Sequence, residues 1–592
     1  MTTQRSLLLA LLGALVIGGG LRLYELDRRT LSHPEYWVPR LDVPEHVQHP
    51  PPRHGVRDVV EQSLSPDVHP PGYHLVMLGW NGTVGTGLRA MRLSSVLAGL
   101  AAILAMFGFA RSVFGGRTAV LATGLLALHG YHVFWSQQLR PWVLLSAIAL
   151  ITCILLVQLA DRWRGWRAAA LVLLTAAGLW IDYYFWPLVA GQILWVLLNL
   201  RGDLRARALS LQLGAVLLAF PVFVYLRFHI VLEGHLGNDV LAHLVWLTGF
   251  GGLLPYVPRA SLVNFPGALL PIGASVIGFS LWVVGLRRSR RRSPDASGSS
   301  GMRANLPWLL IAAAVNAILI EVLLVESIDR RRLYVAVVLA PFILAAAAPP
   351  LIRRLHRADR VLDAIRDHRI VGVVTTSLPA MVVVTPLLLF VGAGLVGRSL
   401  FVDYTLVPLM PFVLVLIAAG IVASRRAAVP LAIGVLAAFA LSNYQWWAIR
   451  GGGRSAANWH GSEGSAWPGT YAHYADYQEL AGSLIPHVEE GDVVLVRSEW
   501  WSEPIHYYLP PDEYTVIAPP RHGTEEELEI WRAGLPDRLW LVGLGGDAGP
   551  GPTLDSLANH FLPGHEPTIA VHGYGGEARL MVPGTTLDSQ RN

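Results

Sequence analysis

Two acidic side chains, Glu35 and Asp67, share one polar stretch of the sequence and are the first candidates for proton-transfer chemistry. A positioned carboxylate can accept the proton of a hydroxyl group, and a phosphate that leaves from the reacting carbon needs no second, protonating acid. One such residue therefore suffices as a general base. For Glu35 the alternative interpretation is a solvated loop carboxylate. For Asp67 it is turn formation before Pro70 and Pro71, or positioning of an acceptor or a divalent ion.

The polar stretch runs from residue 25 to about residue 87 and is rich in proline and histidine. It contains no apolar run long enough to cross a bilayer, so it forms a loop between helices. His46 and His49 are of metal-ligand type, but their spacing matches no known zinc pattern and prolines interrupt it. We therefore predict no metal site and no required cofactor, and a divalent cation remains an alternative.

A group of arginines falls at the expected outer ends of apolar segments. The planar guanidinium donates two parallel hydrogen bonds and so suits a phosphate group. Membrane proteins keep most of their arginines on the cytoplasmic side, so cations on the other side are candidates for binding a phosphate, although snorkelling anchors would look the same in sequence. These candidates are Arg92, Arg140, Arg330, Arg331 and Arg398.

Composition excludes a soluble globule. The 592 residues are 53% hydrophobic and 15% charged with a mean hydropathy of +0.45, whereas about a quarter of a soluble protein is charged. The net charge of +5 comes from arginines in short runs between apolar segments, as orientation signals do, so no nucleic-acid partner is predicted. The one cysteine, Cys153, permits no intramolecular disulfide and is predicted to pack inside.

Apolar length and basic ends together predict about thirteen spanning helices within residues 1–448, with a cytoplasmic N-terminus, the polar stretch outside, and membrane lipids around them. The N-terminal run lacks a convincing cleavage site and is predicted to be a retained helix. The expected spans are approximately Ser6–Leu23, Leu88–Ala110, Thr118–Phe134, Trp142–Leu159, two helices in Ala168–Leu200 divided at Asp182, Ala206–Phe228, one before Arg287, Leu306–Val325, one before Arg353, Val371–Val396, Leu406–Ala423 and Ala428–Trp447.

Residues 449–592 change in character: they are more polar and contain short strand-like runs at 492–497 and 538–543 and a helical piece at 525–533. This pattern predicts a small α/β domain. Because helix thirteen should leave the membrane outward, the domain is expected on the extracytoplasmic side. It has no glycine-rich phosphate loop and no paired CxxC motif, which argues against a nucleotide or zinc site.

Several motifs resemble one family in its own order. Residues 67–80 contain a His-Pro-Pro-aromatic element, and residues 87–95 contain an Arg-Leu-Ser-Ser pattern. These are similar to the first-loop signature of GT-C glycosyltransferases, in particular the bacterial family 39. The resemblance continues at residues 114–116, 135–140, 398–411, 477–481 and 491–492.

The resemblance implies a mainly α, polytopic GT-C fold and the activity of relatives such as protein O-mannosyltransferases and lipid A aminoarabinose transferases. These take sugar from a polyprenyl-phosphate donor, and the acceptor here would be an extracytoplasmic lipid, polysaccharide or protein. Topology favours the same donor class, since nucleotide sugars are absent outside the cytoplasm. His33, His69, Tyr73 and Tyr404 would position the acceptor or the loops.

One departure from the family pattern bears on the base. Family members place an Asp-Glu pair shortly after the first helix, whereas here Glu35 aligns with the second acid and Pro34 replaces the first. Glu35 is the first candidate for the base, because it lies on the loop just after the first helix, where the family's catalytic acid lies, but whether Glu35 or Asp67 is the base stays open. Two other function classes also stay open: a transporter or flippase of a lipid-linked glycan, and a non-catalytic glycan-binding envelope protein. A transporter should show internal repeats and broken helices at mid-membrane, and no clear repeat is present.

Overall fold

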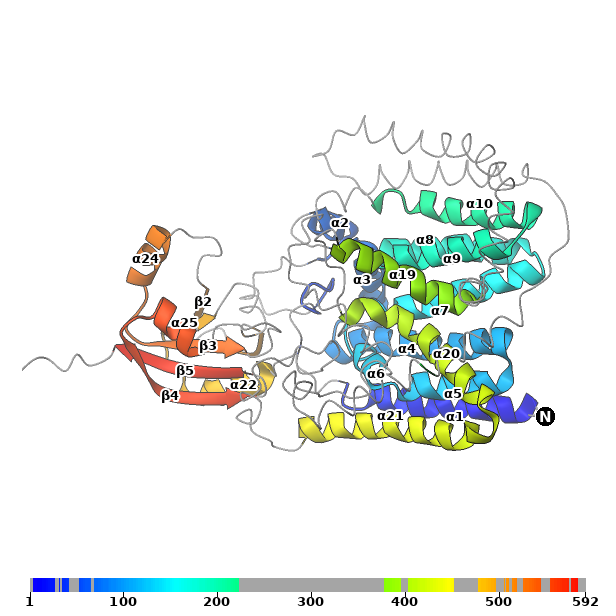
Figure 1. Cartoon of the computed structure of the whole chain (residues 1–592). Helices are drawn as coiled ribbons and strands as arrows, with labels where there is room; N and C mark the ends of the chain where they lie inside the picture. Colours follow the sequence, from blue (N-terminus) through cyan, green and yellow to red (C-terminus); the bar gives the residue numbers. More distant parts are fainter. Residues whose placement is uncertain are drawn as a thin grey trace, which may run out of the picture.

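The computed structural model describes a helical bundle and a C-terminal sheet domain (Figure 1). The residues described are 4–26, 31, 35–41, 53–64, 69–222, 280, 377–395, 403–451, 477–496, 505, 507–509, 514–518, 525–544, 554–573 and 576–583. The predicted class, mainly α with a small sheet domain, is confirmed. Apart from residue 280, residues 223–376 and the spans predicted there lie outside the described residues, so the count of thirteen stays a prediction.

Four helical segments in the described part are long and apolar enough to cross a membrane: α1 (Gln4–Leu23), α4 (Leu88–Phe114), α7 (Trp142–Asp161) and Thr405–Ala423. The last combines the 3-10 helix η4 (Asp403–Leu409) with α20 (Met410–Ala423). Each matches a predicted span closely, which makes the chain an integral membrane protein. The bundle also contains α8 (Gly165–Ile181), α9 (Phe185–Asn199), α10 (Gly202–Leu218), α19 (Leu378–Leu395), the 3-10 turn η5 (Arg425–Ala427) and α21 (Ala428–Gly451).

The third predicted span, Thr118–Phe134, is wrong as a single helix. It consists of α5 (Gly116–Leu128) and the short α6 (Gly130–Trp135), divided at His129. His129 has an extended backbone, and its Nδ1 accepts the His132 amide N–H at 3.2 Å, so it caps α6. The break is stable because the carbonyls that end α5 find donors elsewhere, among them Asn443 on α21, which donates to the Leu128 carbonyl at 2.6 Å.

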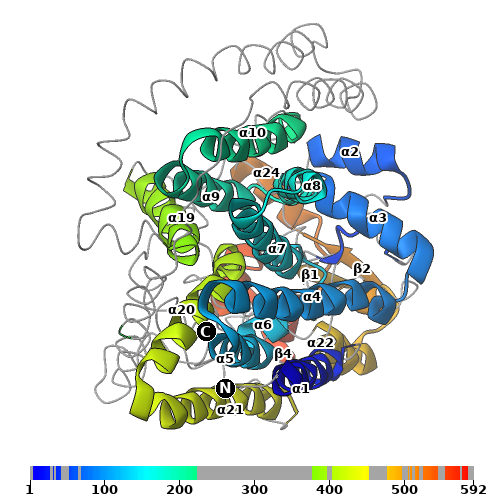
Figure 2. The ribbon, with the colours of Figure 1, turned by 90° about the vertical axis from the view of Figure 1, so that its right-hand side faces the viewer.

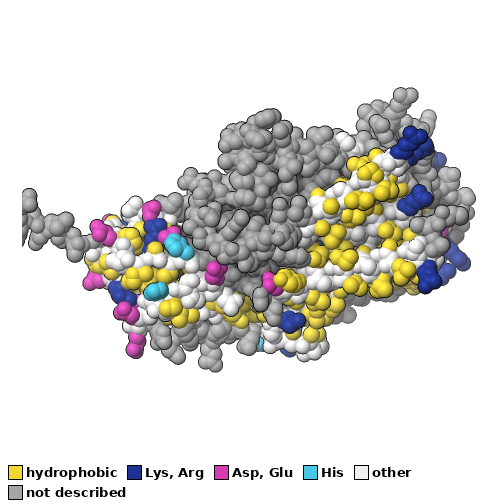
Figure 3. Space-filling view, turned by 90° about the horizontal axis from the view of Figure 1, so that it is seen from below, with side chains coloured by type: hydrophobic (Ala, Val, Ile, Leu, Met, Phe, Trp, Pro, Cys, Tyr) yellow, Lys and Arg dark blue, Asp and Glu magenta, His cyan; other side chains and the backbone are white. Residues whose placement is uncertain are grey.

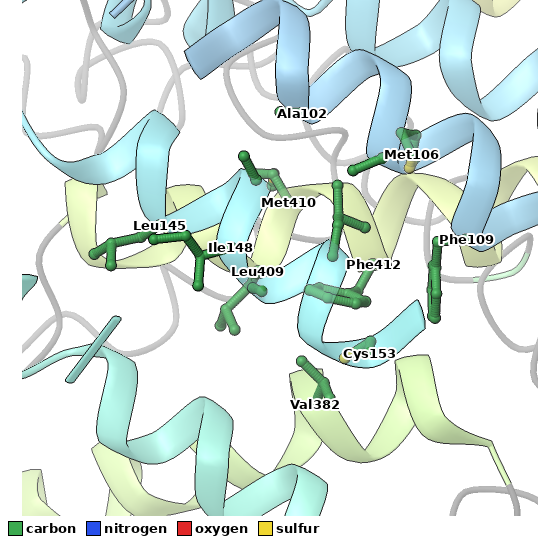
Figure 4. Packing of buried hydrophobic residues seen from close by; sticks show 14 of the residues in the cluster. Ala102, Met106, Phe109, Leu145, Ile148, Cys153, Val382, Leu409, Met410 and Phe412 are labelled. Carbon is green, nitrogen blue, oxygen red and sulfur yellow. The ribbon is translucent and has the colours of Figure 1, made fainter. Parts of the chain in front are cut away.

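The bundle core lies between α4, α7, α19 and α20 (Figure 4). Phe109 on α4 and Phe412 on α20 meet edge to face with their ring centroids 5.4 Å apart. Among these apolar side chains, α7 and the neighbouring helices α9 and α10 share a small polar network. Gln192 on α9 donates to Thr152 at 2.9 Å and to the sulfur of the buried Cys153 at 3.4 Å, and Gln212 on α10 donates to Gln192 at 3.0 Å. Such bonds link helices in lipid.

The outer surface of the bundle is apolar. Seen from below, Figure 3 shows hydrophobic side chains over the helices and a group of basic side chains at the end far from the sheet domain. On α1, for example, Leu9 and Val16 are more than half exposed, as are Val429 and Ile433 on α21. This surface is suited to lipid rather than to water.

The predicted loop contains two short helices, α2 (Val56–Leu64) and α3 (Gly72–Val84). Helix α3 begins directly after Pro71. Helix α3 packs against α4 and α8, and Figure 2 shows it beside both. At Gly72 the approach is so close that an added Cβ would lie 2.2 Å from the Trp180 carbonyl oxygen at the end of α8. Only glycine fits there without movement of the backbone.

We expect Gly72→Ala to lower the midpoint of thermal unfolding, because the methyl group must push α3 away from α8, at a cost of about 1–3 kcal/mol or more. Gly79→Ala is the matched control on the same helix, since an added Cβ there meets nothing within 4 Å. In detergent, the control should unfold at or above the wild-type temperature. Equal midpoints for the two variants would contradict this close contact.

The C-terminal domain contains a five-stranded sheet in the order β2-β1-β3-β5-β4 (Figure 1). The strands are β1 (Asp492–Val496), β2 (Tyr514–Ile517), β3 (Leu539–Leu544), β4 (His565–Gly573) and β5 (Gly576–Pro583). Strand β1 pairs in parallel with β2 and β3, whereas β5 is antiparallel to both β3 and β4.

Helices α22 (Tyr477–Leu484), α24 (Glu525–Ala533) and α25 (Leu554–Phe561) complete the domain with the 3-10 turn η8 (Ile485–His487). Both predicted strands and the predicted helix 525–533 are present within one residue. Buried Trp540 on β3 donates to Asp492, which Arg538 also contacts. The predicted boundary at residues 448 and 449 stays a prediction, and α21 continues to Gly451.

Candidate functional site

Glu35 and Arg92 form a fully buried ion pair near the N-terminal end of α4. The Arg92 Nη2 donates to Glu35 Oε2 at 2.8 Å and the Arg92 Nε donates to Glu35 Oε1 at 3.1 Å, and both side chains have 0% exposure. This two-pronged arrangement fixes both orientation and distance. Sequence reasoning nominated both residues but for different roles, and it did not predict that they would pair. Glu35 is therefore not a solvated loop carboxylate.

A second segment also donates a hydrogen bond to the Glu35 carboxylate. The Leu139 amide N–H donates to Glu35 Oε1 at 2.9 Å, and Ser95 on α4 fixes this segment by donating to the Gln138 carbonyl at 2.6 Å. The Arg92 Nη1 in turn donates to the Leu26 carbonyl at 3.0 Å. Residues 135–140, one of the stretches that carry the resemblance, therefore form a wall of the Glu35 site.

Other residues of the same polar stretch hold the loop around Glu35. Asn81 on α3 donates its side-chain N–H to the Pro39 carbonyl at 2.6 Å. The Arg53 guanidinium lies over the Trp37 ring, 5.4 Å from its centroid. These contacts order a segment that has little regular secondary structure, so the position of Glu35 is determined before any substrate binds.

Tyr73 and Arg140 lie beside this ion pair. Burial raises the pKa of Tyr73, with the charge of Arg140 opposing the rise and the charge of Glu35 adding to it, so the hydroxyl stays protonated at neutral pH. Its hydroxyl lies near the Ser95 hydroxyl. The half-buried Arg140 guanidinium forms no hydrogen bond or ion pair with the described residues. Among those residues, Arg92 is therefore paired with Glu35, whereas Arg140 has no such partner.

The other predicted site residues are only partly covered. His69 is described and half-buried at the entry to α3. The backbone of Tyr404 belongs to η4, but its side chain lies outside the described part. The remaining residues, His33, His46, His49, Asp67, Arg330, Arg331 and Arg398, lie outside the described residues. Within the described ranges no group of three or more His, Cys, Asp or Glu side chains is arranged to hold a metal ion.

One residue that sequence reasoning missed is Arg22, in the last turn of α1. Its guanidinium is completely buried and all five N–H groups donate. The acceptors are Ser136 Oγ (3.0 Å), the carbonyls of Gly18 (2.9 Å), Ala127 (3.1 Å) and Leu126 (3.3 Å), and His132 Nδ1 (3.0 Å).

Arg22 thereby satisfies two terminal carbonyls of α5 with a cation, which also suits the negative end of the helix dipole. Through Ser136 it fixes the segment that carries Leu139. Gln137 adds to this, since its side-chain nitrogen contacts carbonyls of α1 and of the turn after it, including Tyr24 at 2.8 Å. An arginine at the end of an apolar helix was the available signal, because a charge in lipid is expensive unless it is fully paired.

Comparison with known proteins finds a family model that matches part of the chain. Residues 68–226, which include Tyr73, Arg92 and Arg140, match the family model described as dolichyl-phosphate-mannose-protein mannosyltransferase. The predicted resemblance to the GT-C glycosyltransferases is confirmed. No curated protein sequence matches the chain.

Solved GT-C structures also match at low identity. ArnT from Cupriavidus metallidurans in the apo state is 16% identical, with 97% of each chain covered and a TM-score of 0.38. The same protein bound to undecaprenyl phosphate is 14% identical, with 98% of each chain covered and a TM-score of 0.39. The oligosaccharyltransferase of Archaeoglobus fulgidus in complex with zinc and sulfate is 14% identical, covering 90% of this chain and 67% of that one at a TM-score of 0.40.

Proposed function

We propose that this chain is a GT-C glycosyltransferase that transfers a sugar from a polyprenyl-phosphate donor to an extracytoplasmic lipid, polysaccharide or protein acceptor. The observation that carries the proposal is the family match of residues 68–226. By its description, that family uses mannose carried on dolichyl phosphate, which is a polyprenyl phosphate.

The proposed reaction inverts the anomeric carbon. The acceptor hydroxyl oxygen forms a bond to that carbon while the bond to the donor phosphate oxygen breaks, and an outer-loop carboxylate takes the hydroxyl proton. Glu35 and Asp67 are the candidates for this base. In the resting arrangement both Glu35 oxygens already accept hydrogen bonds from Arg92 or Leu139, so the incoming hydroxyl would compete with those donors. That competition favours Asp67 as the base and Glu35 as the residue that fixes the site.

Arg140 is the described residue best suited to the donor phosphate. It ends the wall segment that binds Glu35, it is half-buried, and its charge acts on the buried Tyr73. A guanidinium that has no hydrogen-bond partner among the described residues can give two parallel hydrogen bonds to a phosphate. Arg330, Arg331 and Arg398 remain proposed as further phosphate ligands, with His33, His69, Tyr73 and Tyr404 positioning the acceptor or the loops.

We further propose a cytoplasmic N-terminus and an extracytoplasmic C-terminal domain. Exposed arginines mark the ends of helices near the N-terminus: Arg111 at the end of α4 donates to Gln4 at the start of α1 at 2.9 Å, and Arg425 and Arg426 lie between α20 and α21. Figure 3 shows basic side chains at this end, opposite the sheet domain. Such clustering is typical of the cytoplasmic side.

The test is transfer of radiolabelled sugar from a panel of polyprenyl-phosphate sugars into envelope fractions, at matched expression. We expect the wild type to transfer from at least one donor, and Asp67→Asn to reduce transfer by about 10²-fold or more, as loss of a general base does. Glu61→Gln is the matched control, because Glu61 is an exposed carboxylate of the same loop that pairs with Arg57 on α2. It should transfer at the wild-type rate.

Other outcomes of this assay are informative. If Glu35→Gln abolishes transfer in well-folded protein while Asp67→Asn does not, Glu35 is the base and its pairing with Arg92 must open during the reaction. If the wild type transfers no sugar from any donor, the glycosyltransferase proposal fails and the binding or transport alternatives take its place.

A further inference from the structure

The C-terminal domain contacts the loop that carries Glu35. The contact comes from residues 505 and 507–509, of which Ile505 and Leu509 are buried in the core of the C-terminal domain. Tyr507 and Tyr508 lie between them. Tyr508 packs against the domain core, whereas Tyr507 packs against the core of the helical bundle. This short segment is therefore shared between the two parts of the chain.

Two contacts reach the loop on either side of Glu35. The Leu31 amide N–H donates to the Tyr508 hydroxyl at 2.8 Å, across 477 residues of sequence. The ring of Tyr507 meets the ring of Tyr36, next to Glu35, edge to face with centroids 5.6 Å apart. Tyr507 and Tyr508 also contact each other, with centroids 5.0 Å apart. Both loop residues, Leu31 and Tyr36, are buried.

These contacts complete a set of restraints on Glu35. From the bundle side, Arg92 and Leu139 hold its carboxylate, and Asn81 holds the backbone four residues further on. On the N-terminal side of Glu35, the Tyr508 hydroxyl holds the Leu31 backbone, in addition to the bond from Arg92 to the Leu26 carbonyl. The loop is thus held between the helices and the C-terminal domain.

We propose that Tyr507 and Tyr508 are positioning residues for Glu35, so that the C-terminal domain forms part of the catalytic site. This inference rests on the proposed function, since it assumes that the site around Glu35 carries out the transfer. Tyr508 supplies a hydroxyl acceptor and Tyr507 supplies an aromatic ring. When the domain does not contact the loop, Glu35 loses its alignment with Arg92 and Leu139, and turnover falls although the donor still binds.

The first measurement needs no activity. In the purified full-length protein, hydrogen–deuterium exchange in peptides covering residues 26–41 should rise about fivefold for Tyr508→Phe, the effect of losing one ordinary hydrogen bond at the Leu31 amide. The matched control is Tyr514→Phe, which removes a hydroxyl from β2 of the same domain and should leave these peptides unchanged. Unchanged exchange in Tyr508→Phe would overturn the proposal.

The second measurement separates positioning from stability. We expect Tyr507→Ala to lower kcat about tenfold with the KM for the donor within about twofold of wild type, and Tyr507→Phe to restore kcat because the ring contact with Tyr36 remains. An unchanged kcat in Tyr507→Ala would overturn the positioning role. If the wild type transfers no sugar but exchange still rises in Tyr508→Phe, the proposed function fails while the holding of residues 31–36 by the C-terminal domain stands.

Discussion

Replacing Arg92 with methionine is expected to lower the stability of the protein by about 3–5 kcal/mol, because it leaves the Glu35 carboxylate buried without its cation. Both side chains have 0% exposure, so water cannot take over the lost interaction. Midpoints of thermal unfolding in detergent should show the effect directly. Glu35→Gln should be milder, since the amide oxygen can still accept from Arg92 but the guanidinium loses its counter-charge.

The double variant Glu35→Gln with Arg92→Met removes both charges and should recover part of the stability lost in Arg92→Met. The matched control is Arg57→Met, which breaks a pair with Glu61 on the surface of α2 in the same loop. An exposed pair contributes little, so the midpoint should shift slightly, by the equivalent of at most about 1 kcal/mol. If Arg92→Met behaved like Arg57→Met, the buried ion pair would not determine the structure of the site.

Arg22→Met is expected to have an even larger effect, on the order of 4 kcal/mol or more. Each lost hydrogen bond to a buried acceptor costs about 1–3 kcal/mol, and the substitution removes donors from two α5 carbonyls, Ser136 and His132 together. We expect the variant to be recovered in low yield and to elute as aggregates in size-exclusion chromatography.

The control for this prediction is Arg5→Met on the same helix, where the arginine is exposed and should be replaceable. Gly99→Ala tests the same site from another side, since an added Cβ would lie 2.8 Å from Arg22 Nε and 2.6 Å from Ser136 Oγ. Both Arg22→Met and Gly99→Ala should be defective. Normal yield and normal unfolding of Arg22→Met would show that the network is dispensable.

Much of the fold could be read from the sequence because lipid imposes a simple rule. A helix must be apolar over about 20 residues, and its ends are marked by charge, so helices such as α4 and α7 begin at the predicted residue. The break at His129 could not be read in this way. It depends on donors from Asn443 and Arg22, which come from helices that are distant in sequence.

The candidate site could also be predicted only in part from the sequence. Glu35, Tyr73, Arg92 and Arg140 could all be nominated, because acids, arginines and motif residues near helix ends are recognisable types. Their relations could not be predicted. The pairing of Glu35 with Arg92 spans 57 residues, and the contact of Leu31 with Tyr508 spans 477. Such contacts depend on how the helices and the C-terminal domain pack together. A local sequence pattern does not contain this information.

Cys153 gives the protein a practical property. It is the only cysteine in the chain and is buried in the bundle, where Gln192 contacts its sulfur. Water-borne maleimide reagents should therefore leave the native protein unmodified. A cysteine introduced at an exposed site, for example in place of Glu566 on β4, would carry a spin label or fluorophore at one defined position without removal of any native thiol.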